Sequence, residues 1–79
     1  MVIAYVLINC KIGFEDSIIK ELKSMSHVKD VHATYGAYDM LAKIESWSVH
    51  DLTETITSQI RKMDGINSTL TLMGIEELK

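Results

Sequence analysis

Groups that could bind a small molecule gather at one short turn near the middle of the chain. The stretch Tyr35-Gly36-Ala37-Tyr38-Asp39 places a carboxylate directly after a glycine turn. One interpretation is structural, because an aspartate beside a tight turn accepts hydrogen bonds from nearby backbone. The other is a site for a zwitterion, in which Asp39 and carbonyl groups hold an ammonium group and backbone N–H groups hold a carboxylate. The residues alone leave both interpretations open.

Histidines and a cysteine are the other side chains with chemical potential. On a strand, His32 shares a face with Asp30, whereas His27 points to the opposite face, so they do not converge as metal ligands. His50 stands apart, near the start of a helix, and we expect no metal and no cofactor. Cys10, the single cysteine, ends an apolar run, which predicts a small buried residue in a reducing compartment.

The elements that position these residues follow from an internal repeat of the chain. Shifted by 38 positions without a gap, the first half matches the second in its apolar residues and one glycine. The matched pairs are Ile18 with Ile56, Leu22 with Ile60, Met25 with Met63, Val28 with Ile66 and Gly36 with Gly74. Each half therefore predicts a strand, a helix and a strand, and the turn at Gly36–Asp39 is the seam between the halves.

Hydrophobic periodicity gives the bounds of these elements. Residues 2–10 form a continuous apolar run, typical of a strand covered on both faces. We expect a helix over 15–25, strands over 27–35 and 38–45, and a last strand over 66–75. The second helix is expected to begin at Ser48, His50 or Asp51, to bury Val49, Leu52, Ile56, Ile60 and Met63, and to end at Gly65. Trp47 is expected to pack this helix onto the sheet.

The element order predicts an α+β, ferredoxin-like βαββαβ sandwich, with a four-stranded antiparallel sheet and both helices on one face. The small residues Ala4 and Ala42 let helices approach closely, so we assign the helix side to Val2, Ala4, Val6, Met40, Ala42 and Ile44. The opposite, open face is then expected to carry Ile3, Tyr5, Leu7, Leu41, Lys43, Thr69, Thr71 and Met73.

This open face is too apolar for a solvated sheet and therefore predicts an interface. Two such faces packed together would bury on the order of 1,600 Å², enough for a stable homodimer, a dimeric α/β barrel. We place Ile3, Tyr5, Leu7, Leu41 and Met73 in this dimer interface. The alternative is a monomer that Lys43 and the threonines keep soluble.

Length and charge restrict the class of protein further. The 79 residues predict a single domain over 1–79, and the net charge of −3 comes with scattered basic residues. Without a basic stripe, direct binding of nucleic acid is not expected. The apolar start has no basic flank and is too short to span a membrane, which predicts a cytoplasmic protein.

A set of ordered motifs resembles one known family. Val31, Gly36-x-Tyr38-Asp39-Met40-Leu41 and, later, Met63-x-Gly65-Ile66-x-x-Thr69-x-Thr71 resemble the effector-binding (RAM) domain of the Lrp/AsnC family of feast/famine regulators over essentially the whole chain. The chain departs from the family pattern at Asp64, where a proline is common, and in lacking the amino-terminal helix-turn-helix, so it looks like a stand-alone domain without a DNA-binding domain.

The resemblance implies a function and a site. Small effectors, typically amino acids, would bind between dimers that assemble into tetramers, octamers or rings. The implied effector site contains Tyr35, Gly36, Ala37, Tyr38 and Asp39, with Thr69 and Thr71 as contributors. The expected role is a ligand-sensing domain, not an enzyme, that modulates transcription regulators through assembly and joins full-length Lrp/AsnC regulators as partners.

Two other functions share this fold. The first is a small dimeric α/β-barrel enzyme of the monooxygenase or isomerase type, for which His32 with Tyr35 or Asp39 would be the candidate groups. The second is an amino-acid-binding domain of the ACT type, which would use a glycine turn after the first strand, here at Gly13.

Overall fold

Strands and helices alternate along the chain in the predicted order. The computed structural model describes residues 1–74. Its elements are β1 (Val2–Cys10), α1 (Glu15–Ser24), β2 (Val28–Ala33), β3 (Met40–Ser46), α2 (Val49–Glu54), the π-helix η1 (Thr55–Ile60) that continues α2, and β4 (Ile66–Met73). The last strand thus ends at Met73, and the predicted end at Ile75 lies outside the described residues.

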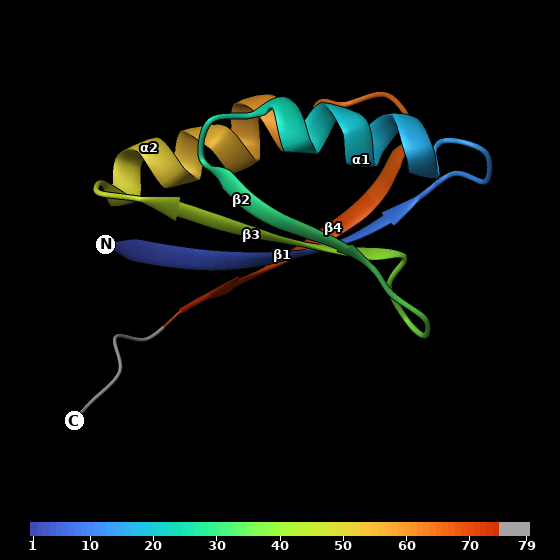
Figure 1. Cartoon of the computed structure of the whole chain (residues 1–79), viewed down its shortest axis with the longest axis horizontal. Helices are drawn as coiled ribbons and strands as arrows, with labels where there is room; N and C mark the ends of the chain where they lie inside the picture. Colours follow the sequence, from blue (N-terminus) through green and yellow to red (C-terminus); the bar gives the residue numbers. More distant parts are fainter. Residues whose placement is uncertain (75–79) are drawn as a thin grey trace.

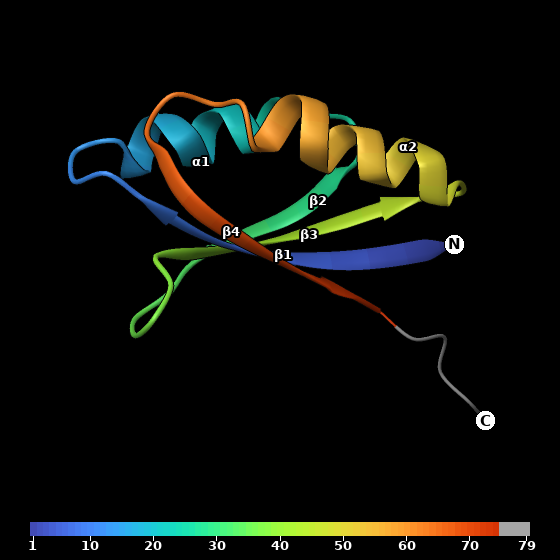
Figure 2. The same ribbon diagram turned by 180° about the vertical axis from the view of Figure 1, so that it is seen from behind.

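The sheet has the order β2-β3-β1-β4 and all its pairs are antiparallel. Both helices lie on one face of the sheet, and no helix of the described residues covers the other face (Figures 1 and 2). The hairpin between β2 and β3 projects from one end of the sheet, far from the start of β1. The ferredoxin-like α+β fold is confirmed. In the described part of the chain, no helix has the length and apolar character needed to cross a membrane.

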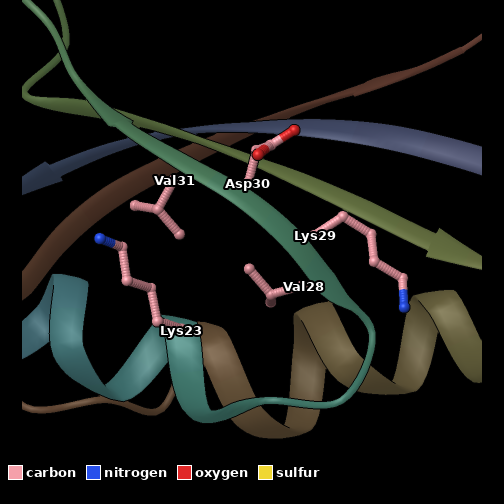
Figure 3. A pocket seen from close by; sticks show the side chains of 5 residues that line it. All are labelled: Lys23, Val28, Lys29, Asp30 and Val31. Carbon is pink, nitrogen blue, oxygen red and sulfur yellow. The ribbon is translucent and has the colours of Figure 1, made fainter.

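Each edge strand contains a β-bulge near its start. In β2, Val28 pairs with Ile44 but Asp30 pairs with Lys43, which leaves Lys29 as the extra residue. The bulge puts Val28 and Val31 on the helix side of β2 and Asp30 on the other side, as Figure 3 shows.

The bulge in β4 occupies the equivalent place in the second half. Asn9 pairs with Ser68 but Cys10 pairs with Ile66, which leaves Asn67 unmatched. Asn67 lies 38 positions after Lys29, so the internal repeat includes the bulge.

The β4 bulge reverses part of the predicted face assignment. Because directly paired residues share a face, Thr69, Thr71 and Met73 lie on the helix side, with their partners Ile8, Val6 and Ala4. The prediction that these three residues lie on the open face is wrong, and Met73 therefore does not lie on the face to which the dimer interface was assigned. A bulge shifts the alternation by one residue, which moves Leu70 and Leu72 to the open face instead.

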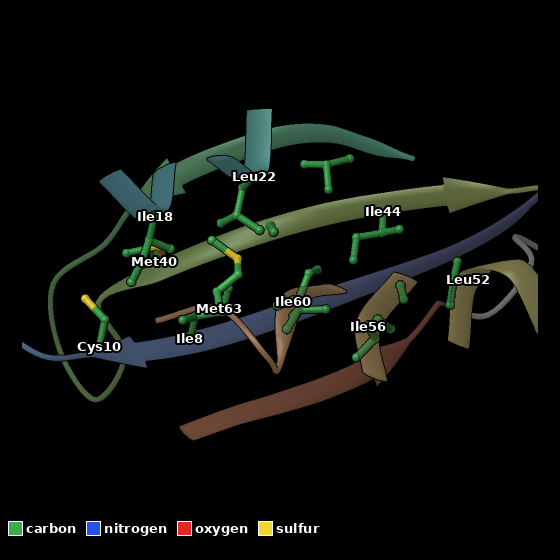
Figure 4. Close-up of a cluster of buried hydrophobic side chains, with 14 residues drawn as sticks. Ile8, Cys10, Ile18, Leu22, Met40, Ile44, Leu52, Ile56, Ile60 and Met63 are labelled. Carbon is green, nitrogen blue, oxygen red and sulfur yellow. The ribbon is translucent and has the colours of Figure 1, made fainter. Parts of the chain in front are cut away.

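The core lies between the sheet and the helices, as Figure 4 shows. The predicted helix-side residues Ala4, Val6, Met40, Ala42 and Ile44 are all fully buried, and Val2 packs against this cluster. The core is completed from the helices and from the turn after η1, by Ile18, Leu22, Leu52, Ile56, Ile60 and Met63. Val49 was predicted to join this stripe, but it is exposed at the start of α2.

The second helix begins after Ser48, one of the predicted caps, and changes from an α-helix to a wider π-helix at Thr55. Ser48 caps it, because its side chain accepts a hydrogen bond from the N–H of Asp51. The hydroxyl of Thr55 donates to the carbonyl of Asp51 at 3.0 Å, a contact that loosens the helical ladder. Over η1 the N–H of Arg61 reaches back five residues, to the carbonyl of Ile56.

Candidate functional site

The hairpin turn that ends at Asp39 is fastened to β1. Oδ2 of Asp39 accepts a hydrogen bond from the N–H of Cys10 at 2.9 Å. The N–H of Asp39 lies 2.9 Å from the carbonyl oxygen of Ile8 and 3.1 Å from Oδ1 of Asn9. The structural interpretation of Asp39 is therefore correct for one of its carboxylate oxygens. Within residues 1–74, no backbone N–H donates a hydrogen bond to its other oxygen, Oδ1.

Asn9 and Thr34 complete the attachment of the turn, and the sequence analysis did not identify either of them. Nδ2 of Asn9 donates to the carbonyl of Ala37 at 2.9 Å, and Oγ1 of Thr34 donates to the carbonyl of Tyr38 at 2.7 Å. The signal for Asn9 was present, because it is the one polar side chain with amide groups inside the apolar run of β1.

The tip of the turn is exposed. Tyr35, Gly36 and Ala37 all lie at the surface. Gly36 has a φ of +114°, a backbone angle that residues other than glycine rarely adopt. Among the described residues, the N–H groups of Gly36, Ala37 and Tyr38 take part in no internal hydrogen bond. The turn therefore combines a fixed carboxylate with backbone donors that face solvent.

Burial raises the pKa of the Cys10 thiol above its ordinary value of 9.0. The negative charge of Asp39 adds to this effect, followed by that of Glu15. The thiol is therefore protonated at neutral pH, which agrees with the prediction of a small buried residue rather than a reactive one.

Thr69 and Thr71 are not brought to the turn within one chain. They lie on the edge strand β4, which is separated from β3 by β1. Thr69 borders a hollow of about 330 Å³ at the β4 bulge, together with Arg61, Ile66, Asn67 and Ser68.

A second hollow, of about 250 Å³, lies at the β2 bulge and is drawn in Figure 3. It is lined by Lys23, Val28, Lys29, Asp30 and Val31. Each of these residues precedes its counterpart at the β4 bulge by 38 positions. Both hollows are thus consequences of the repeated bulge and lie away from the Gly36–Asp39 turn.

The candidate groups for an enzyme are not gathered in a cavity. His32 pairs with Leu41 on the open face and is exposed, as is Tyr35. Among the described residues the buried polar side chains are Ser46 and Thr55. Both are engaged, Ser46 as acceptor for the N–H of Ser48 and Thr55 as donor to the helix backbone. Described residues also contain no cluster of three metal-ligating side chains.

The open face carries two apolar rows. In the first, Leu7 lies between Leu41 on β3 and Leu70 on β4, and in the second Tyr5 lies between Lys43 and Leu72. The predicted positions of Ile3, Tyr5, Leu7 and Leu41 on this face are confirmed by the register. Lys43 forms an ion pair with Glu45 at 3.4 Å. Apolar side chains thus dominate β1 and β4, and the charges lie on β3.

Comparison with known proteins matches this architecture to one family. The model of the Lrp/AsnC ligand binding domain matches residues 3–79. The solved structure of FFRP-DM1 is 37% identical with a TM-score of 0.91, and covers 95% of this chain and 100% of its own. A hypothetical protein, PHS023 from Pyrococcus horikoshii, is 38% identical with a TM-score of 0.90, over 98% of this chain and 93% of its own. Both relatives are similar in length to this chain.

A longer protein shares the fold. A transcriptional regulator from Neisseria meningitidis, solved as its L-Met complex, is 11% identical with a TM-score of 0.87, over 99% of this chain and 52% of its own. No protein with a curated description matches the sequence. The family model spans nearly the whole sequence, and the chain therefore belongs to the Lrp/AsnC ligand-binding domain family.

Proposed function

We propose that this domain senses a small effector, an amino acid, at the Gly36–Asp39 turn and modulates transcription regulators through its state of assembly. The observation that carries the proposal is the turn itself. Asn9 and Cys10 hold Ala37 and Asp39 against β1. Among the described residues, the N–H groups of Gly36, Ala37 and Tyr38 form no internal hydrogen bond, and Oδ1 of Asp39 accepts none from the backbone. A zwitterion needs this combination, with an anion for the ammonium group and N–H donors for the carboxylate.

The unit that binds the effector is a homodimer formed through the open face. The rows centred on Leu7 and Tyr5 place large apolar side chains side by side on β3, β1 and β4. Leu70 and Leu72 remain about half exposed in a single chain. Face-to-face packing would remove these groups from water at about 25 cal/mol per Å² of apolar surface. The interface therefore consists of Ile3, Tyr5, Leu7, Leu41, Leu70 and Leu72.

The effector site is completed between dimers. The turn is an exposed corner, so a second dimer would have to close it around a ligand. Ligand binding would then favour the larger assembly by mass action. The L-Met complex of the Neisseria regulator supports an amino acid as the effector class. Effector contacts by Thr69 and Thr71 stay a prediction, which now requires that they come from a neighbouring copy.

Calorimetric titration of amino acids into the wild type and Asp39→Asn tests this site. The amide keeps an acceptor for the N–H of Cys10 but removes the charge that would hold the ammonium group. Asp16→Asn, on the exposed side of α1, is the matched control. We expect a loss of affinity of at least tenfold for Asp39→Asn and none for the control. Equal affinities in all three proteins would refute the assignment of Asp39.

A further inference from the structure

The single tryptophan is the most exposed large apolar side chain at the end of the molecule opposite the hairpin turn. Trp47 follows β3 and is 82% exposed, so the prediction that it packs α2 onto the sheet is wrong. Its position is nevertheless fixed. The N–H of Ser48 donates to Oγ of Ser46 at 3.2 Å, and Oγ of Ser48 accepts from the N–H of Asp51 at 3.3 Å. These bonds hold the residues on both sides of Trp47 and leave the indole outside the core.

A hollow of about 310 Å³ lies beside this indole. Its walls come from the start of the chain, the connection between α1 and β2, the end of β3 and the first turn of α2. Met1, His27, Lys29, Glu45 and Asp51 line it together with Trp47. The N–H of Glu45 donates to the carbonyl of His27 at 2.9 Å, so two of these walls are joined.

The charges around the hollow are arranged so that the hollow of one copy is complementary to the hollow of a second copy. The ammonium group of Lys29 comes from the β2 side and the carboxylate of Asp51 comes from the β3–α2 side, whereas the carboxylate of Glu45 is already paired with Lys43. A twofold axis places the β2 side of one copy against the β3–α2 side of the other, because in such a contact residue i meets j and j meets i. Opposite charges then face each other on both sides of the axis.

We propose that Trp47 anchors a second contact between copies of this chain, in which the indole of each copy occupies the hollow of the other. A rigidly presented tryptophan beside a recess is the kind of residue that dominates binding energy at an interface. The large surface of an indole gains most when it is removed from water. The hollow has room for an aromatic side chain, and its charged rim gives the contact its orientation.

This contact differs from the sheet-to-sheet dimer. The open face is centred on Leu7, whereas Trp47 lies beyond the end of β3, and the proposal requires that both contacts form at once. The Trp47 contact joins dimers into larger assemblies. The pairing of two Trp47 side chains does not depend on the proposed function or its sheet-to-sheet dimer. Only the size of the unit that each Trp47 contact joins depends on that dimer.

The emission of Trp47 reports on the contact directly, because no other tryptophan contributes. We would record emission and molar mass, by light scattering after size exclusion, over a range of protein concentrations. The inference predicts that wild-type protein forms assemblies larger than a dimer with blue-shifted emission, and that dilution lowers the mass and shifts the emission to the red together. Emission typical of a solvated indole at every concentration would overturn the inference.

Two variants separate this contact from other causes. Trp47→Ser is expected to stop at the dimer, whereas Ile12→Ser, which removes an even more exposed apolar side chain from another loop, should assemble as the wild type does. Wild-type mass for Trp47→Ser would contradict the contact. In Leu41→Lys, which tests the sheet interface, a Trp47-dependent pair should persist. If Leu41→Lys leaves the mass unchanged, the sheet interface fails while the Trp47 result still stands. An emission shift caused by an added amino acid without a change in mass would assign the hollow to a small ligand and overturn the contact.

Discussion

Oδ2 of Asp39 lies 2.9 Å from the backbone nitrogen of Cys10, which donates a hydrogen bond to it. The last directly paired residues of β1 and β3 are Ile8 and Met40. The carboxylate of Asp39 therefore attaches the hairpin to β1 one step beyond the end of this strand pairing. The side chain of Asp39 thus helps Asn9 and Thr34 to hold the turn in place, while its second oxygen, Oδ1, accepts no backbone hydrogen bond among the described residues. Any test of ligand binding at Asp39 has to keep this structural bond intact.

The first prediction concerns the stability that this bond provides. Asp39→Ala leaves the partly buried N–H of Cys10 without its acceptor, and hydrogen bonds to charged groups contribute about 1.5–3 kcal/mol. We expect the free energy of unfolding to fall by about that amount, as measured by urea denaturation. Asp39→Asn keeps an oxygen at this place and should lose less. An Asp39→Ala protein as stable as the wild type would mean that the bond contributes nothing.

The second prediction tests the register of β4. Leu70→Lys places a charge in the proposed sheet interface, where burial of an unpaired ammonium group is costly. We expect sedimentation to show the loss of the sheet-to-sheet dimer. Met73→Lys is the matched control, because Met73 lies on the same strand but on the helix side, where it is 49% exposed. If Met73→Lys breaks the dimer and Leu70→Lys does not, the two faces of β4 are exchanged.

The third prediction compares two glycines with positive φ. At Gly65, with φ +89°, an added Cβ would lie 2.5 Å from the ring of Phe14, whereas at Gly36, with φ +114°, it would meet nothing within 4 Å. Alanine at Gly36 costs only backbone strain, about 1–3 kcal/mol. Gly65→Ala should cost more, since Phe14 must also move. Thermal denaturation of both variants checks this order, and equal melting temperatures would contradict it.

The fourth prediction follows from the raised pKa of Cys10. Because the folded state holds the thiol proton more tightly than the unfolded state, the unfolded chain binds fewer protons above pH 9. The contribution of Cys10 to stability is complete below the pKa of the unfolded chain and is lost as the pH rises through the pKa of the folded protein. Wild-type stability should thus fall more steeply above pH 9 than that of Cys10→Ser. Parallel pH profiles of the two proteins would rule this out.

Much of this fold could be predicted from the sequence because the repeat of 38 positions sets apolar spacing in both halves. Ile18 with Ile56 and Leu22 with Ile60 face the core in the structure as the periodicity indicates. Ser48 begins α2 by local chemistry, which a short stretch of sequence reveals. The predicted helix end at Gly65 is wrong, because η1 ends at Ile60 and Gly65 lies in the turn before β4.

The errors arise where one residue changes the register or the exposure of those that follow. Asn67 carries no mark of a bulge, and regular alternation from Ile66 onward places Thr69, Thr71 and Met73 on the wrong face. The repeat relates the bulge at Lys29 to the one at Asn67, but neither bulge was predicted from the sequence. The prediction that Trp47 is packed failed for a different reason. Large aromatic residues are usually buried, but the hydrogen bonds of the two neighbouring serines turn this side chain outward.

Melting of the wild-type protein in the presence of each of the twenty amino acids, with molar mass followed by light scattering, tests the central claim most directly. A ligand at 100 times its dissociation constant adds about 2.7 kcal/mol to stability, which raises the melting temperature of a domain of this size by several degrees. The account predicts such a rise for one or a few amino acids, together with an increase in mass. No rise with any of the twenty would contradict the proposal that this domain senses an amino acid.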